Sequence, residues 1–161
     1  MKRLLTSLLI LISVTVSAQT FVKEVEAGKR IELNYSYKMR GDVPVQGSGK
    51  AIIQFPCFKT EGNGLRIISD GKTRWTMDLE AKEVYIEFGD DYEKGYIQIL
   101  DKMRFIKENK DSVAGTYRNS DKEFEFNLTN IRKTEKVEGD VSEFRLDVKT
   151  LDKSWIVTDL R

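Results

Sequence analysis

IISDGKTRWTMDLEAKEVYIE, residues 67–87, contains two alternating runs of apolar residues, each preceded by a polar turn. The large apolar residues at every second position are Trp75, Met77, Leu79, Val84, Ile86 and, just beyond the stretch, Phe88. Successive side chains of a β-strand point to opposite faces of the sheet, so a period of two predicts two antiparallel strands with one apolar face. The stretch therefore predicts a hairpin and raises the question of what its apolar face contacts.

The same alternation recurs along most of the chain. Further strands are predicted at residues 31–39, 45–55, 58–61, 65–68, 112–118, 122–128, 143–149 and 155–157. Gly62-Asn63-Gly64 is typical of a hairpin turn, and Asp70 is expected to form its turn through its own side chain. Gly47 and Gly49, inside a predicted strand, indicate a bulge or a strongly curved sheet. The pattern predicts one mainly β, antiparallel domain with minor α structure.

One helix is predicted after Gly95. Ile99, Leu100, Met103 and Ile106 lie on one side at helical spacing, with Lys and Glu residues opposite. This stripe is expected to pack on the sheet. Residues 20–29, which precede the first clear strand, are expected to form a short helix or an added strand.

The N-terminus has the pattern of a cleaved secretory signal peptide. Lys2 and Arg3 precede an apolar run at residues 4–16, and Val16-Ser17-Ala18 is a small-x-small cleavage signal. The run is shorter than the roughly 18 to 20 apolar residues that usually span a bilayer. We therefore expect a soluble exported protein, residues 19–161, that forms a single domain.

Composition excludes several classes of chemistry. The chain has no histidine, which rules out a Ser-His-Asp triad, a Cys-His pair and a histidine-ligated zinc. Cys57 is the only cysteine, so no internal disulfide is possible, and it is expected to be a small buried hydrophobe rather than a nucleophile. Removal of the leader changes the net charge from +1 to −1, without a basic block for nucleic acid. No enzyme activity is expected.

Metal and cofactor sites are not predicted either. The acidic segment at residues 89–93 lacks the full spacing of a calcium loop, so a solvated loop is the better interpretation.

The turn and hairpin resemble a family motif. Ser69-Asp70-Gly71-Lys72-Thr73-x-Trp75, followed by Met77, an acidic turn and residues 83–86, resembles the "SDGKxxW" turn and hairpin of the periplasmic outer-membrane lipoprotein carrier proteins, the LolA family. Gly47-x-Gly49, residues 51–53 and Pro56-x-Phe58 are similar to the family's preceding strands and stand in the same order. The resemblance covers residues 35–106. Leu79 stands where the family has proline, and the N- and C-terminal regions are shorter.

The resemblance implies a fold and a function. The fold would be a curved antiparallel sheet, or half-barrel, with a helix covering its concave face. The function would be that of a periplasmic carrier, which shields the acyl chains of lipoproteins during their transfer to the outer membrane. Its partners would be a lipoprotein, an inner-membrane releasing complex and an outer-membrane acceptor, and the protein would act as a monomer. Near the place of a family arginine that holds down the lid stand Lys59 and Arg66.

The candidate acyl-chain contacts follow from the alternation together with this resemblance. They are Tyr35, Tyr37, Ile53, Trp75, Met77, Ile86, Ile99 and Met103. The same side chains would equally form an ordinary packed core, so two alternatives stay open. The protein would be a general carrier of lipids or other hydrophobic molecules, or a β-domain that binds other proteins and has no ligand cavity.

Overall fold

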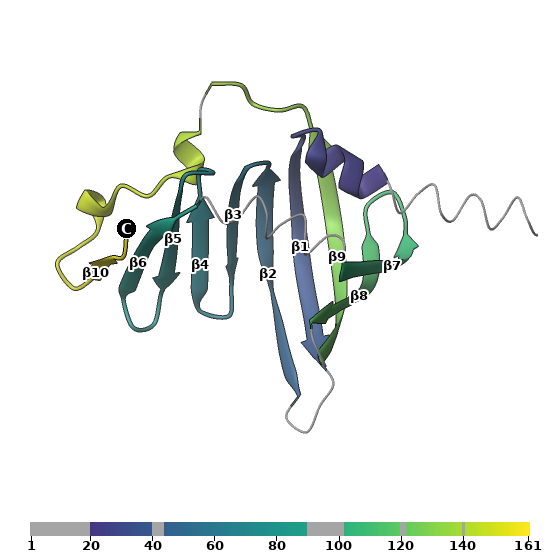
Figure 1. The fold of residues 1–161 in the computed structure, drawn as a ribbon, viewed down its shortest axis with the longest axis horizontal. Coiled ribbons are helices and arrows are strands. Elements are labelled where there is room, and N and C mark those ends of the chain that lie inside the picture. The colour runs from purple at the N-terminus through teal and green to yellow at the C-terminus, as the bar shows by residue number, and fades with distance from the viewer. Residues whose placement is uncertain (1–19, 40–43, 90–101, 120–121, 140) are drawn as a thin grey trace, which may run out of the picture.

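The structure is a computed structural model that describes residues 20–39, 44–89, 102–119, 122–139 and 141–161. These residues form one open sheet, a short helix at residues 20–26 and two 3₁₀ turns (Figure 1). The strands are β1 (Arg30–Met39), β2 (Val45–Gln54), β3 (Cys57–Gly62), β4 (Leu65–Ser69), β5 (Thr73–Asp78), β6 (Glu83–Phe88), β7 (Met103–Glu108), β8 (Val113–Asn119), β9 (Lys122–Thr134) and β10 (Ile156–Asp159). The 3₁₀ turns are η1 (Ser142–Phe144) and η2 (Val148–Thr150). The predicted mainly β fold is confirmed.

The strand order in the sheet is β10-β6-β5-β4-β3-β2-β1-β9-β8-β7. Strands β1 to β6 form an antiparallel meander, and β9 returns to pair with the free side of β1. The C-terminal strand β10 pairs in parallel with β6, so the prediction of an antiparallel sheet is wrong for this one edge. Because β10 is reached by a long crossover rather than by a hairpin, a parallel pairing is sterically open to it.

The turns of the meander follow from local chemistry. Asn63 and Gly64, between β3 and β4, both have positive φ, 53° and 76°, as a type I′ hairpin turn requires. Before β5, the Asp70 carboxylate accepts hydrogen bonds from the backbone N–H groups of Lys72 and Thr73, at 3.0 and 2.8 Å. The expectation that Asp70 forms its turn is confirmed.

The two faces of the sheet follow from the register, because directly paired residues share a face. Tyr35 on β1 begins a row of directly paired residues that crosses the sheet strand by strand as far as β10. The row continues through Gly49, Gly62, Leu65, Asp78, Glu83 and Ile156. We call this side the tyrosine face. Trp75 and Met77 belong to the other set of alternating positions, and their side is the tryptophan face.

Each face has its own core. On the tyrosine face, Phe21 and Val25 of the helix pack against Ile31 and Leu33 of β1, together with residues of β8 and β9. On the tryptophan face of β4, β5 and β6, the buried residues are Ile68, Trp75, Met77, Val84 and Ile86. The C-terminal segment, residues 135–155 between β9 and β10, covers this second cluster. Its contacting residues are Leu146, Val148, Leu151 and Trp155. The helix and the C-terminal segment therefore cover opposite faces at opposite ends of the sheet (Figure 1).

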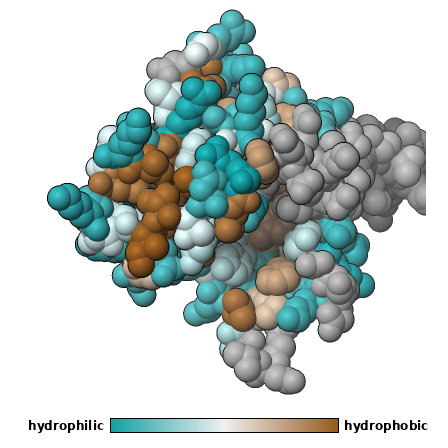
Figure 2. Space-filling view, turned by 60° about the vertical axis from the view of Figure 1, so that its left-hand side comes forward, coloured by the Kyte–Doolittle hydropathy of each residue, from teal (hydrophilic) through white to brown (hydrophobic). Residues whose placement is uncertain are grey.

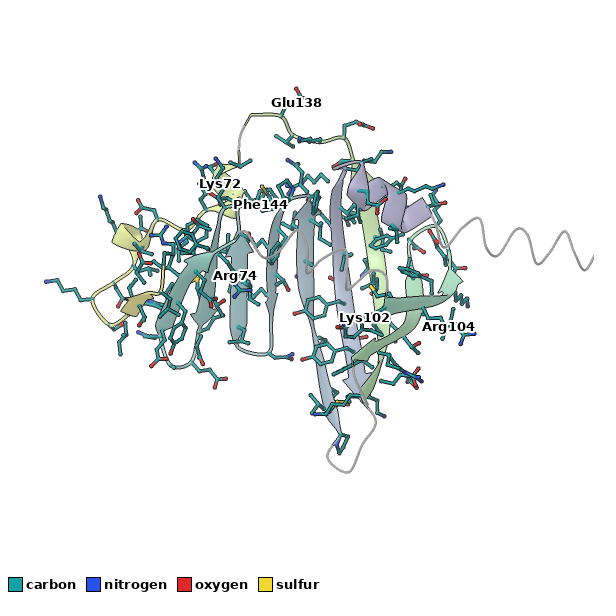
Figure 3. All side chains as sticks on the ribbon, viewed as in Figure 1. Lys72, Arg74, Lys102, Arg104, Glu138 and Phe144 are labelled. Carbon is teal, nitrogen blue, oxygen red and sulfur yellow. The ribbon has the colours of Figure 1, made fainter. Side chains whose placement is uncertain are left out.

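Polar contacts hold the beginning of the C-terminal segment in place. The Gln54 side chain, 2% exposed, exchanges two hydrogen bonds with the backbone of Val137, at 3.0 and 3.1 Å. Arg30 binds the Glu143 carboxylate at 2.7 Å, and next to it Phe144 is buried against the sheet (Figure 3). These contacts join the segment to β1 and β2 before it reaches the Trp75 cluster.

The helix predicted after Gly95 is partly contradicted. Lys102 has helical conformation, but Met103–Glu108 is strand β7, and Ile99 and Leu100 lie outside the described residues. Periodicity does not separate helix from strand in such a short apolar run. Met103 and Phe105 alternate in β7 and pack on the tyrosine-face core, which decides for the strand. The alternative of a helix at the N-terminus is confirmed at residues 20–26.

The strand predicted at residues 143–149 is also wrong. Phe144, Leu146 and Val148 do point to apolar surroundings, but the segment forms η1 and η2. It crosses a face of the sheet instead of extending an edge, so no strand lies beside it to accept a ladder of backbone hydrogen bonds. The alternation of apolar residues therefore predicted correctly which side chains of this segment are buried or partly buried, but it did not predict the 3₁₀ turns.

Candidate ligand-binding face

The eight predicted acyl-chain contacts do not form one surface. Tyr35, Tyr37, Ile53 and Met103 lie on the tyrosine face. Their counterparts on the hairpin, Trp75, Met77 and Ile86, lie on the tryptophan face. Ile99 lies outside the described residues. A ligand on one face cannot touch both groups, because the backbone of the sheet separates them.

The tryptophan-face group is structural. Trp75 is 9% exposed, Met77 2% and Ile86 5%, and the C-terminal segment packs over them. For this group, the interpretation as an ordinary packed core is the one that fits the structure.

The tyrosine-face group forms an aromatic floor over small residues. The rings of Tyr35 and Tyr37 are stacked, with centroids 6.5 Å apart and an interplanar angle of 11°. Their hydroxyls are held across the sheet, where Thr60 Oγ1 donates to Tyr35 at 3.2 Å and Asn63 Nδ2 donates to Tyr37 at 3.3 Å. The two rings therefore lie flat over β2 and β3 instead of standing away from the sheet.

The glycines of β2 explain this arrangement. A Cβ atom at Gly47 would lie 2.5 Å from the Tyr37 hydroxyl, and one at Gly49 would lie 2.6 Å from the Tyr35 hydroxyl. The register of β2 with both neighbours is unbroken, so the bulge proposed for these glycines is absent from this strand. Glycine is needed at positions 47 and 49 because the Tyr37 and Tyr35 rings occupy the space that a side chain would fill.

Beyond the tyrosines, the tyrosine face of β3 to β10 carries partly exposed apolar residues. Leu65 is 42% exposed, Tyr85 37% and Ile156 60%, while Phe58 and Ile67 are partly buried. Leu65 and Ile156 belong to one row, and Ile67 and Tyr85 to the next. Figure 2, with the β10 end turned forward, shows apolar residues gathered among hydrophilic ones. Neither described core cluster includes these five side chains.

Charged residues share the rows of these apolar residues, with Asp78 and Glu83 between Leu65 and Ile156. Arg74 and Glu87, paired across β5 and β6, form an ion pair with Nε 3.1 Å from the carboxylate (Figure 3 labels Arg74). Next to Ile156, Glu83 accepts a hydrogen bond from the Tyr85 hydroxyl, and this bond raises the pKa of Tyr85. The tyrosine face of β3 to β10 therefore mixes apolar with polar and charged residues along each row.

Sequence reasoning missed Leu65, Ile67, Tyr85 and Ile156 as candidates. One signal was present in the consecutive Ile67-Ile68, which places an apolar residue on each face of β4. Such a pair marks a strand with apolar surroundings on both sides. The prediction relied instead on the larger alternating residues around Trp75, which lie on the other face.

The remaining candidates lie away from this surface. Lys59 and Arg66 are on the tryptophan face, where Arg66 Nε binds the Glu61 carboxylate at 2.7 Å, so neither gates the tyrosine face. Cys57 is 5% exposed, and burial together with the nearby Asp70 charge raises the pKa of its thiol. A raised pKa disfavours the thiolate form of Cys57, which agrees with the prediction of a small buried hydrophobic side chain and not a nucleophile.

Other kinds of site have little support in the described part of the chain. No group of three or more Cys, Asp and Glu side chains gathers there to hold a metal ion. The acidic segment predicted as a solvated loop falls, except for Gly89, outside the described residues. No helix of the described ranges is long and apolar enough to cross a membrane.

Comparisons with known proteins add no relative. No family model matches the chain, and no curated protein matches it significantly. The fold and the chemistry of the tyrosine face are therefore the basis for assigning a function.

Proposed function

We propose that this protein is an exported, periplasmic carrier that shields acyl chains on the tyrosine face of its sheet. The ligand is held without covalent chemistry, and the protein is not an enzyme. In its fullest form the proposal is a LolA-like half-barrel. It receives a lipoprotein from an inner-membrane releasing complex and passes it to an outer-membrane acceptor. The signal peptide ending at Ala18 and the "SDGKxxW"-like turn at residues 69–75 support this form.

One observation carries the proposal. On β3 to β6, both faces of the sheet carry apolar residues, but the two faces differ in how these residues are covered. Around Trp75 and Met77 the tryptophan face is buried under the C-terminal segment, and its exposed apolar residues are Phe88 and Val157, at the end of β6 and on β10. On the tyrosine face, Leu65, Tyr85 and Ile156 stay 37 to 60% exposed, and neither described core cluster includes them. In the proposal, these exposed apolar side chains are the points of contact with the ligand.

The energetics fit an acyl chain. Burial of one CH₂ group is worth about 0.8 kcal/mol, so a long chain gains much by leaving water. A bilayer core about 30 Å thick holds two chain lengths, and neighbouring strands lie about 4.8 Å apart. One extended chain would therefore cover about three strand spacings, which is the distance from Phe58 on β3 to Tyr85 on β6.

The runner-up is a β-domain that binds another protein. Both faces have clusters of buried apolar residues, around Ile31 and around Met77, as a domain with a filled core would. A general carrier of free lipid would use the same surface as a lipoprotein carrier, and the two differ only in what is bound.

Native mass spectrometry of the mature protein, taken gently from its own periplasm, tests the proposal. The mass increment of an acylated protein would support lipoprotein transport, and that of a lipid would support the general carrier. Repeated recovery of bare protein, with no uptake of added acyl chains, would leave the protein-binding domain.

A pair of matched variants tests the surface. Leu65 and Val157 are both 42% exposed, but Leu65 lies on the tyrosine face and Val157 on the tryptophan face. Leu65→Asp should weaken binding of a fluorescent long-chain fatty acid by about tenfold, the effect of losing one or two buried methylenes. Val157→Asp should leave binding unchanged. Equal effects of the two substitutions would reject the tyrosine face as the site.

A further inference from the structure

An open groove of about 480 Å³ lies on the side of the sheet opposite Tyr35, over β1, β2 and β9. Its lining residues are Glu32, Leu33, Asn34, Lys50, Ala51, Ile52, Asn130 and Arg132. Asn34 and Lys50 are direct cross-strand partners, and so are Glu32 and Arg132. The volume lies within the range of small-molecule sites, about 300–1,000 Å³.

A bulge in β9 shapes one wall of the groove. Glu32 pairs with Arg132 but Asn34 pairs with Thr129, so β9 has one residue more than β1 over this interval. Asn130 has a φ of 53°, a conformation that non-glycine residues adopt rarely. Ile131 turns into the tyrosine-face core, at 7% exposure, while its two neighbours line the groove. Bulges often direct side chains toward a site in this way.

Arg132 differs from most arginines of the described residues, whereas Lys50, like most of the described lysines, is an unpaired cation. Arg30, Arg66 and Arg145 each pair with a carboxylate at 2.7 to 2.9 Å. Within the described ranges, neither Arg132 nor Lys50 has an ion pair, although both side chains are at a groove. The carboxylate of Glu32 also lines the groove, but it accepts hydrogen bonds from Arg30 at 3.0 and 3.2 Å. The groove therefore has a net positive charge, and the N–H groups of Arg132 and Lys50 have no carboxylate partner in the described residues.

We propose that this groove binds a phosphate group, with Arg132 and Lys50 supplying the charge and Asn34 and Asn130 supplying amide donors. A guanidinium binds two oxygens of an anion at once, and an ammonium acts as a point charge beside it. The ligand is a phosphate ester, either a soluble one or the headgroup of a phospholipid. Ile52, partly buried on the floor, contacts its carbon part. The site is separate from the tyrosine face, so each proposal stands or fails alone.

Two-dimensional ¹⁵N NMR of the mature protein tests the site with three probes. The probes are inorganic phosphate, glycerol 3-phosphate and phosphatidylglycerol vesicles, with phosphatidylcholine vesicles as the reference. Saturable shifts of the Asn34 and Ile52 amides are expected with glycerol 3-phosphate, and they should weaken as salt is added. Binding to glycerol 3-phosphate alone identifies a soluble ester. Additional broadening with phosphatidylglycerol, but not with phosphatidylcholine, identifies the headgroup.

Three substitutions make the test directional. Arg132→Gln should weaken glycerol 3-phosphate binding by about tenfold, the value of one charged hydrogen-bonding partner. Glu32→Gln should strengthen binding, because it removes the one negative charge of the lining. Lys38→Gln, on the same face of β1 but outside the groove, should change nothing.

Two results would overturn the assignment. One is the absence of saturable shifts with all probes in a folded protein, shown by a dispersed spectrum. The other is binding that responds equally to Arg132→Gln and Lys38→Gln, since general surface charge would then explain it.

Discussion

Tyr35 and Trp75, the two most prominent aromatic candidates of the sequence, lie on opposite faces of the same sheet. Tyr35 shares its row with Leu65 and Asp78, and Trp75 belongs to the alternate positions of β5. The first lies flat over glycines on an open surface, and the second is 9% exposed beneath the C-terminal segment. Trp75 is accordingly part of a packed core, whereas Tyr35, partly buried beside the other core, contacts the ligand in the proposed function.

Trp75→Ala is expected to destabilise the protein by about 3–5 kcal/mol, the usual cost of truncating a buried aromatic residue. The reason is the cavity left among Ile68, Met77 and Leu146. Urea unfolding gives the free energy of unfolding, and Leu65→Ala, at a 42% exposed position, is the control with a loss under about 1 kcal/mol. Fatty-acid affinity measured on the folded fraction should fall for Leu65→Ala and stay constant for Trp75→Ala. The reverse order would place the ligand on the tryptophan face.

Asp70 connects the turn before β5 to the C-terminal segment, and its substitution separates the two contacts. Asp70→Ala removes the acceptor for the N–H groups of Lys72 and Thr73 as well as the partner of Arg145, 2.9 Å away. We expect a loss of about 1–3 kcal/mol, because two backbone donors lose their acceptor. Asp70→Asn keeps an oxygen for the turn and should cost less. Because Arg145 is 59% exposed, Arg145→Gln should cost under about 1 kcal/mol.

The same carboxylate gives a pH dependence. Burial raises the pKa of Asp70, but the hydrogen bonds from Thr73, Lys72 and Arg145 outweigh it, so the pKa is lowered from its ordinary 3.8. A lowered folded-state pKa contributes stability above the unfolded value, and this contribution is lost as the pH falls below about 4. Urea midpoints measured between pH 3 and 6 should show a smaller acid loss in Asp70→Asn. An unchanged acid profile in that variant would contradict this role.

Glu108 should behave in the opposite way. Burial raises its pKa above the ordinary 4.5, against the lowering effects of Lys133 and of a hydrogen bond from the Phe21 backbone, while Glu24 adds to the rise. The ionised form is therefore less favourable in the folded protein, and stability falls as the pH rises from about 4.5 through the folded-state pKa. Glu108→Gln should remove this loss and be more stable than the parent at pH 7. A ¹³C NMR titration of the Glu108 carboxyl measures the shift directly.

Glycine substitutions test the packing of the tyrosine floor. A Cβ atom at Gly49 would lie 2.2 Å from the Glu61 backbone oxygen, a contact that only a backbone shift relieves. Gly49→Ala should cost about 1–3 kcal/mol or more. At Gly47 the nearest atoms are the ends of the Asn63 and Tyr37 side chains, at 2.1 and 2.5 Å, and side chains shift more easily than backbone. Gly47→Ala should therefore cost less in thermal unfolding, and equal costs would show that Tyr37 is as fixed as the backbone.

The hairpins were predictable because their determinants are local. Asn63-Gly64 adopts the positive φ values of its turn, and Asp70 closes the next turn through its own carboxylate. Within the β5–β6 hairpin, Trp75 pairs with Ile86 and Met77 with Val84, as the common register of the two runs requires. In contrast, the short run at Met103–Glu108 fits either a helix or a strand, and pairing with β8 decided it.

The sequence by itself determined the strands other than β7, the hairpin turns at Asn63-Gly64 and Asp70, and which side chains of each strand share a face. Only the tertiary structure decided which face of each strand is covered, and by what. Alternation reads the same whether the apolar set meets a ligand, a helix or a crossing segment, since a period of two specifies sides but not partners. The coverage of Trp75 depends on contacts with residues 146–155, some 70 to 80 positions further along the chain, and no local pattern contains that contact.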